Sequence, residues 1–190
     1  MKMIKKYLIM TIITFVVFIC GCSKSNTNMD TYLKSGEIID SYAKDFMPDI
    51  KELSQYKDIS YKYNKESILW YTSDAMTLVV EYDDETYKNE KEKLLDRYTF
   101  LSEKIPFDEG GLYIIPEYEF SIDSYNFKVV EESDKDNTDY PKSFGMIGTS
   151  DEKRSIAYLY FYDFDLDYIG DKDEKSSMAN FVKKYFKYDF

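Results

Sequence analysis

Histidine is absent from the 190-residue chain, and cysteine occurs only at Cys20 and Cys22. Without histidine, the chain can form no Ser-His or Cys-His nucleophile pair and no histidine-ligated zinc site. Because both cysteines lie near the start, residues 23–190 contain no thiol, no disulfide and no thiolate metal ligand. An enzyme built on this chain would therefore need carboxylate, lysine or tyrosine side chains as its acid and base.

Glycine is also scarce, with seven residues, and none of them belongs to a phosphate-binding loop. Gly110 and Gly111 are an isolated pair, and Gly145 and Gly148 have neither the spacing nor the following helix that such a loop requires. The sequence therefore gives no support to nucleotide binding. With 36 acidic residues against 25 basic ones, the chain also repels nucleic acid, and we expect no nucleic-acid partner.

Long apolar runs are missing except near the N-terminus, where residues 7–19 are apolar and follow a basic start over residues 1–6. This run is shorter than the roughly 20 apolar residues that a membrane-spanning helix needs. A basic region, an apolar region and a small-residue site, in that order, are typical of a secretory signal. We therefore expect residues 1–21 to be a signal peptide.

The end of this signal, Ile19-Cys20-Gly21-Cys22, resembles the lipobox of bacterial lipoproteins. In that family a diacylglyceryl group is attached to the cysteine, and cleavage before it makes the cysteine the new N-terminus. The resemblance implies lipidation of Cys22 and a location on the extracytoplasmic face of the cell membrane, with the lipid as the membrane contact. If the apolar segment were instead kept as a membrane anchor, the protein would still face outward.

Charge and composition extend this interpretation. Residues 1–21 carry three of the 25 basic residues and no acidic one, so their removal leaves 22 basic and 36 acidic side chains and a formal charge of −14. Such a surface suits a cation-bearing partner, or it keeps a tethered domain soluble. In its signal and its Lys-, Ile-, Tyr- and Asp-rich composition, the chain resembles small lipoproteins of Gram-positive bacteria of the clostridial type. That resemblance implies surface exposure and no particular activity.

The rest of the chain has the length of one domain, and neither a repeat nor a change of composition divides it. Residues 22–29 are polar and aperiodic, which indicates a flexible tether, and residues 30–190 form the expected domain. The polar stretch over residues 132–139 predicts an exposed, mobile loop. A break at Pro106, Gly110 and Gly111 predicts a further loop.

Hydrophobic periodicity predicts both helices and strands in this domain. Residues 155–162 are apolar or aromatic on both faces, which indicates a central strand covered on both sides. We therefore predict an α+β fold, a mainly antiparallel sheet with three helices packed on it. The predicted helices cover residues 30–47, 83–101 and 178–186, and the predicted strands cover residues 59–64, 68–72, 76–82, 119–122, 125–131, 144–149 and 155–162. Asp83 is the expected cap of the second helix. The expected apolar face of that helix comprises Tyr87, Leu94, Leu95, Tyr98 and Leu101. Its opposite face is expected to be solvated charge without special meaning, and it comprises Lys88, Asn89, Glu92, Lys93 and Asp96. The expected buried face of the last helix comprises Met178, Phe181, Val182, Tyr185 and Phe186.

One acidic segment has the spacing of a calcium-binding loop. Acidic residues stand at positions 1, 3, 5, 9 and 12 of the window that starts at residue 163, where oxygen ligands can converge on a hard cation. Tyr168 occupies the position that calls for glycine, and the glycine is displaced to Gly170. The same acids are also expected at a solvated strand end and at a helix N-terminus, so calcium is a hypothesis beside that structural explanation. The candidate ligands are Asp163, Asp165, Asp167, Asp171 and Glu174.

Aromatic residues are abundant, with 20 tyrosines, 13 phenylalanines and one tryptophan. Exposed tyrosines can stack on sugars or form a partner-binding surface, but their strand and helix spacing favours core packing. With 36 acidic residues, some pair of carboxylates will reach a glycosidase-like separation by accident.

Three functions therefore remain open on the sequence alone. We favour a non-catalytic module that binds a protein, a cell-wall polymer or a small ligand. The alternatives are an extracellular carboxylate-dependent hydrolase and a calcium-binding surface module. Apart from calcium under this last hypothesis, we expect no cofactor.

Overall fold

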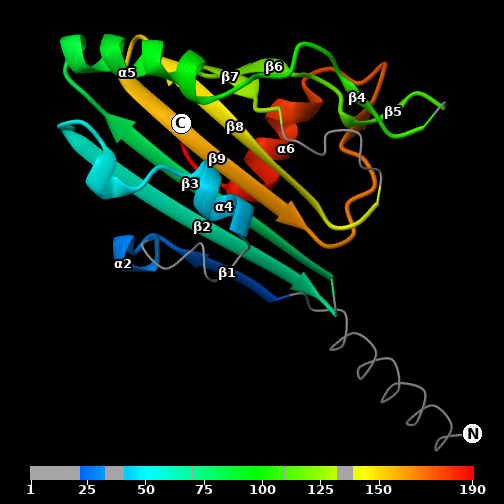
Figure 1. The fold of residues 1–190 in the computed structure, drawn as a ribbon. Helices are drawn as coiled ribbons and strands as arrows, with labels where there is room; N and C mark the ends of the chain where they lie inside the picture. The colour runs from blue at the N-terminus through cyan, green and yellow to red at the C-terminus, as the bar shows by residue number, and fades with distance from the viewer. Residues whose placement is uncertain (1–21, 33–40, 70, 109, 132–138) are drawn as a thin grey trace, which may run out of the picture.

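The computed structural model describes residues 22–32, 41–69, 71–108, 110–131 and 139–190. Within these ranges the main sheet has seven strands in the order β1-β2-β3-β9-β8-β7-β6, and every neighbouring pair is antiparallel (Figure 1). A smaller sheet has the order β10-β5-β4. The main strands are β1 (Cys22–Asn26), β2 (Asp58–Ile68), β3 (Tyr71–Glu81), β6 (Glu119–Ile122), β7 (Tyr125–Val129), β8 (Lys142–Ser150) and β9 (Ser155–Asp163), and the small ones are β4 (Ile105–Pro106), β5 (Leu112–Ile115) and β10 (Gly170–Asp171).

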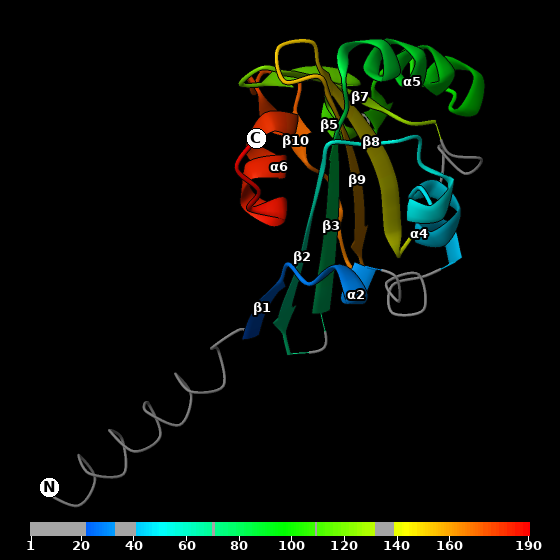
Figure 2. The ribbon, with the colours of Figure 1, turned by 90° about the vertical axis from the view of Figure 1, so that its left-hand side faces the viewer.

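Helices cover both faces of the main sheet. Figure 2 shows α6 (Ser177–Phe186) on one face, with α4 (Ser41–Phe46) and α5 (Asp84–Arg97) on the other. The one-turn α2 (Met29–Tyr32) and a 3-10 turn (Ile50–Glu52) lie in the connections before β2. The predicted fold class, a single α+β domain with helices packed on a mainly antiparallel sheet, is confirmed.

Two hydrophobic cores lie on the two faces, and β9 contributes to both. Leu159 and Phe161 belong to the core under α6, whereas Tyr158 and Tyr160 belong to the core under α4 and α5. These four side chains are at most 3% exposed. Since β9 is also the fourth of the seven strands, the prediction of a central, doubly covered strand is confirmed.

Local side-chain chemistry explains where α5 begins and which face of α6 is buried. Asp83 caps α5 by accepting hydrogen bonds from the backbone amides of Glu85 and Thr86, at 3.0 and 2.9 Å. In α6 four residues of the predicted face are buried, namely Met178, Phe181, Val182 and Phe186. The fifth, Tyr185, is half-buried and packs against the same core.

The C-terminal end of α6 rests on the polar row of β2. The buried Asn64 side chain donates a hydrogen bond to the Phe186 carbonyl, and the Lys62 ammonium donates one to the Lys187 carbonyl. These bonds satisfy carbonyls that a helix end leaves without an intrahelical partner. A row of β2 that looks solvent-facing in the sequence is thereby used to dock the helix.

The prediction of a separate strand over residues 68–72 is wrong. Residue Ile68 pairs directly with Tyr71, so these residues form the turn of a hairpin between two eleven-residue strands, β2 and β3. Leu69 has a φ of +58°, as expected in a tight turn. Trp70, which we placed inside that strand, lies outside the described residues.

The prediction of a flexible tether from Cys22 onward is also corrected. Residues Cys22–Asn26 form the edge strand β1, which pairs with β2 from Cys22 opposite Ser67 to Asn26 opposite Tyr63. Backbone hydrogen bonds can pair any sequence, so a polar segment without an apolar pattern can still form an edge strand.

Two other predictions are modified, and a third falls almost entirely outside the described residues. The predicted helix over residues 30–47 appears as α2 and α4, and residues 33–40 between them lie outside the described ranges. The predicted loop after Pro106 contains the short strands β4 and β5 at its two ends. Residues 132–138 of the expected mobile loop also lie outside the described ranges.

Candidate functional site

A groove of about 670 Å³ lies between α5 and the outer part of the sheet, on the α4 and α5 face. Its floor is formed by alternate residues of two neighbouring strands, Asn126 and Lys128 of β7 and Ile147 and Thr149 of β8. The helix α5 forms one wall, and Asp151 and Arg154 of the turn between β8 and β9 also line the groove. We call this hollow the basic groove.

Apolar side chains line the middle of the basic groove. Leu94 and Leu95 come from α5, Phe100 follows this helix, and Ile147 lies on the floor. Leu95 is 72% exposed, so the prediction that it belongs to the buried face of α5 is wrong. The reason is that Tyr87 and Leu94 alone carry the buried stripe of this helix, and Leu95 lies beside that stripe.

Basic side chains surround this apolar surface and give the groove its name. Its lining includes four basic and only two acidic side chains, although the whole chain has a formal charge of −11. The acidic ones are Glu92 and Asp151. The basic ones are Lys88, Lys91, Lys128 and Arg154.

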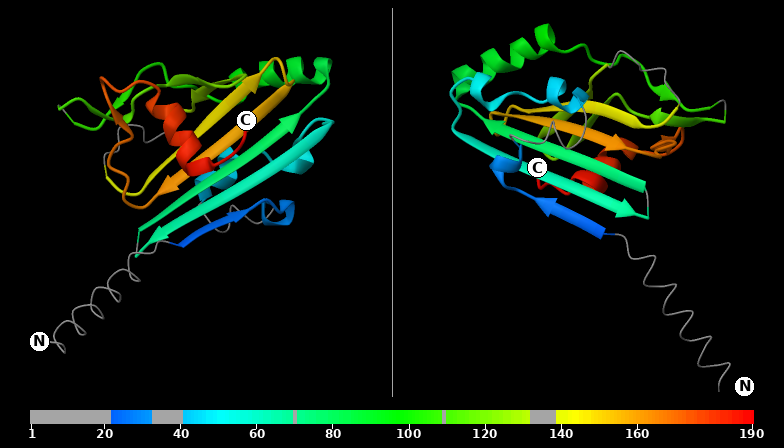
Figure 3. Two further views of the ribbon diagram at one scale, coloured as in Figure 1. Left: turned by 180° about the vertical axis from the view of Figure 1, so that it is seen from behind. Right: turned by 60° about the horizontal axis from the view of Figure 1, so that its bottom comes forward.

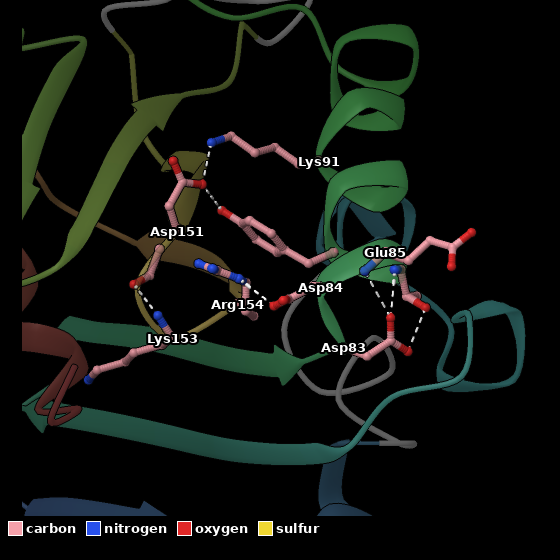
Figure 4. A network of polar contacts seen from close by, with 10 residues as sticks. Asp83, Asp84, Glu85, Lys91, Asp151, Lys153 and Arg154 are labelled. Carbon is pink, nitrogen blue, oxygen red and sulfur yellow. Dashed lines mark hydrogen bonds and ion pairs between the residues drawn. The ribbon is translucent and has the colours of Figure 1, made fainter.

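Asp151 holds the helix wall to the end of the groove. Its Oδ1 atom lies 2.6 Å from the Lys91 Nζ atom and accepts a hydrogen bond from the Tyr87 hydroxyl, also at 2.6 Å (Figure 4). The hydrogen bonds from Lys91 and then from Tyr87 lower the pKa of Asp151. Burial, and secondly the Asp151 carboxylate, raise the pKa of the Tyr87 hydroxyl.

The other basic side chains make ion pairs on the surface. The Arg154 Nε atom is 2.7 Å from Asp84 Oδ1, and the Lys128 Nζ atom is 2.8 Å from Glu119 Oε1. Both pairs are at least 39% exposed on each side, and such pairs contribute only about 0–1 kcal/mol. A bound anion can therefore replace these partners at small cost.

A second hollow of about 370 Å³ lies on the opposite face, beneath the C-terminal residues. Its lining includes four carboxylate side chains, but its hydroxyls are already paired with one another. The Ser60 and Tyr188 hydroxyls are 2.6 Å apart, as are those of Tyr125 and Ser155. We interpret this hollow as the seam where the C-terminal segment packs on the sheet.

The five acidic candidate calcium ligands extend from the last residue of β9 to the segment before α6, and the structure uses two of them in turns. Asp163 accepts hydrogen bonds from the Ser73 hydroxyl and from the Asp165 amide, and Asp171 accepts them from the Asp173 and Glu174 amides. In the described part of the chain, which includes all five, no three acidic side chains form a group that could hold a metal ion.

The basic groove was not predicted from the sequence. Lys88 and Glu92 lie on the helix face that we expected to be solvated and without special meaning. The available signal was the spacing of Lys88, Lys91 and Leu95, which repeats every three or four residues and places two cations and a leucine on one helix face. Lys128 and Arg154 come from elements distant in sequence, so only the fold brings them to the same place.

The structure thus combines an α+β domain with a groove that basic and apolar side chains line. No protein-family model, curated protein or solved structure matches this chain. Among the described residues, no helix is both long and apolar enough to cross a lipid bilayer.

Proposed function

We propose that this chain is a lipid-anchored, extracytoplasmic binding protein whose basic groove takes a small amphiphilic anion. The observation that carries the proposal is the combination of four basic side chains and an exposed leucine in one groove of an otherwise acidic protein. The order of residues 1–22 supports the location, because it has the form of a lipoprotein signal that ends at Cys22.

The dimensions and chemistry of the groove favour a ligand with an apolar body and one anionic group. Small-molecule sites typically measure about 300–1,000 Å³, and the groove falls within this range. Leu95 and Phe100 would contact the apolar body. Lys88 from the α5 wall and Lys128 from the floor would contact a carboxylate or phosphate.

The titratable groups of the groove favour binding over catalysis. A general acid at neutral pH needs a raised carboxyl pKa, but the pKa of Asp151 is lowered by Lys91 and Tyr87. The pKa of Tyr87 is raised, so this hydroxyl stays protonated. Neither group is therefore suited to be the general acid of the alternative hydrolase.

Dodecanoate is a suitable probe for the groove. In calorimetric titrations of residues 23–190, we expect it to bind and dodecyltrimethylammonium not to bind. The double variant Lys88→Glu, Lys128→Glu replaces two cationic contacts with negative charges, so it should weaken dodecanoate binding about tenfold or more. A tenfold loss of affinity corresponds to about 1.4 kcal/mol of binding free energy. The matched control Lys57→Glu, Lys172→Glu changes the net charge equally, outside the groove, and should bind as the wild type does. Equal weakening in both variants would overturn the proposed site.

The lipid anchor has its own test. Cys22→Ala removes the residue that would carry the acyl chains, so it should abolish membrane attachment and the incorporation of radiolabelled fatty acid. Stable anchoring takes two or more acyl chains. The control Cys20→Ala keeps Cys22 and should remain attached. Failure of fatty acid to enter the wild-type protein would refute the lipid anchor.

A further inference from the structure

One end of the main sheet gathers the start of β1, the β2–β3 hairpin and the end of β9. Cys22 pairs with Ser67, and Ser67 pairs with Thr72 on the next strand. The Phe164 amide donates a hydrogen bond to the Thr72 carbonyl at 3.1 Å, which continues the row across β9. Figures 1 and 3 show β1 beginning at the same end as this hairpin.

Large apolar side chains are exposed at this end. Leu69 is 63% exposed, Tyr71 40%, Tyr140 45% and Phe164 49%. They are four of the seven large hydrophobic side chains that are exposed among the described residues. Because Lys142 pairs with Asp163, Tyr140 lies just beyond the same end on β8. We call these four residues the apolar end.

We propose that the apolar end lies against the outer surface of the membrane, so that the domain has a fixed orientation on the lipid bilayer. The proposal deepens the proposed function and rests on the attachment at Cys22. With strands about 4.8 Å apart, the row from β1 to β8 spans roughly 20 Å, which is wide enough to hold the domain at a surface.

The position of the membrane anchor in the chain identifies the membrane as the surface that contacts the apolar end. Residues 1–21, with their apolar run, connect directly to the first residue of β1, so the membrane meets the domain at Cys22 whether the anchor is a lipid or the retained segment. Because β1 is paired with β2 from its first residue, no free spacer separates the anchor from the sheet. Tyrosine, phenylalanine and leucine are side chains that favour the membrane interface.

The charges around the apolar end favour zwitterionic lipid. Two acidic side chains at this end are paired, Asp74 with Lys65 at 3.3 Å and Glu66 with Lys187 at 2.6 Å. Asp165 and Asp167 are exposed close to Phe164, and they would repel an anionic headgroup. Contact should therefore weaken as the content of anionic lipid rises.

Trp70 is the only tryptophan of the chain and is bonded to Leu69 and Tyr71, so it can report on this contact. The full chain, produced in a lipidating host, would be reconstituted into phosphatidylcholine vesicles with or without brominated acyl chains. We expect brominated lipid to lower tryptophan emission about twofold, because Leu69 and Tyr71, the neighbours of the tryptophan in the chain, would lie at the membrane interface. Phosphatidylglycerol should reduce this quenching.

Two variants and a flotation assay separate the outcomes. Leu69→Asn with Phe164→Ser should remove most of the quenching and leave the protein on floating vesicles; asparagine tolerates the positive φ of residue 69. Tyr56→Ser, an exposed aromatic next to the opposite end of β2, should quench as the wild type does. Wild-type protein that floats without quenching would overturn the orientation alone. Protein that does not float would overturn the anchor, and the orientation with it.

Discussion

Asp151 connects the turn after β8 to the helix α5 through one carboxylate oxygen. It lies in the turn after β8 and contacts Lys91 and Tyr87, both on α5 (Figure 4). Its side chain is 73% exposed, so solvent screens the pair and its contribution to stability is small. Its main effect is positional, because it fixes Lys91 at the edge of the basic groove.

The pH dependence of this contact can be predicted in sign. Because the pKa of Asp151 is lowered in the folded protein, its contribution to stability is present above the ordinary carboxyl value of 3.8 and is lost as the pH falls through the lowered pKa. Asp151→Asn should destabilise the domain by less than about 1 kcal/mol at pH 7. Urea unfolding should show this difference shrinking below pH 4, where the wild-type carboxylate begins to protonate. Asp96→Asn, an exposed carboxylate on α5, is the control. A difference that grows toward low pH would contradict this account.

At the scale of elements, β9 holds the two halves of the core together. Its alternate side chains belong to different cores, so one substitution directly changes the packing of only one core. The backbone pairing of β9 connects the two cores. Its neighbours β3 and β8 pair with it along its whole length. Damage to this strand therefore affects the entire sheet.

Leu159→Asp should unfold the domain. Leu159 is 0% exposed beneath α6, and burial of an unpaired carboxylate there should cost more than about 4 kcal/mol. The matched control is Leu95→Asp, because Leu95 is 72% exposed on α5 and should change stability by less than about 0.5 kcal/mol. Thermal melting of residues 23–190 measures both. An unchanged melting temperature for Leu159→Asp would show that β9 is not the central strand.

At the scale of the whole molecule, the acidic surface dominates the response to salt. The mature chain would carry 36 acidic side chains, and their mutual repulsion destabilises the compact state. We therefore expect calcium, magnesium and sodium at equal ionic strength to raise the melting temperature by similar small amounts.

The calcium hypothesis makes the opposite prediction for the same melting experiment. A calcium site would stabilise the wild type at several millimolar calcium, and Asp165→Asn with Asp167→Asn would remove the gain. Magnesium would substitute poorly because it retains its waters. A calcium-specific gain of this kind would contradict the screening account, in which these carboxylates do not form a common site.

The sequence by itself determined the elements whose apolar pattern is local. The two apolar faces of residues 155–162 predicted β9, the spacing of Met178, Phe181 and Val182 predicted α6, and Asp83 predicted the start of α5. The absence of histidine likewise excluded whole classes of chemistry. These inferences hold because side-chain periodicity within one element does not depend on the rest of the fold.

The tertiary structure decided what depends on partners distant in the sequence. Residues Cys22–Asn26 are polar and became β1 only because the edge of β2 offered backbone partners. The turn at Leu69 looked like part of a strand because its residues are apolar, and only the pairing of Ile68 with Tyr71 reveals the hairpin. The basic groove takes its cations from α5, β7 and the β8–β9 turn, so it exists only where the fold brings these three elements together.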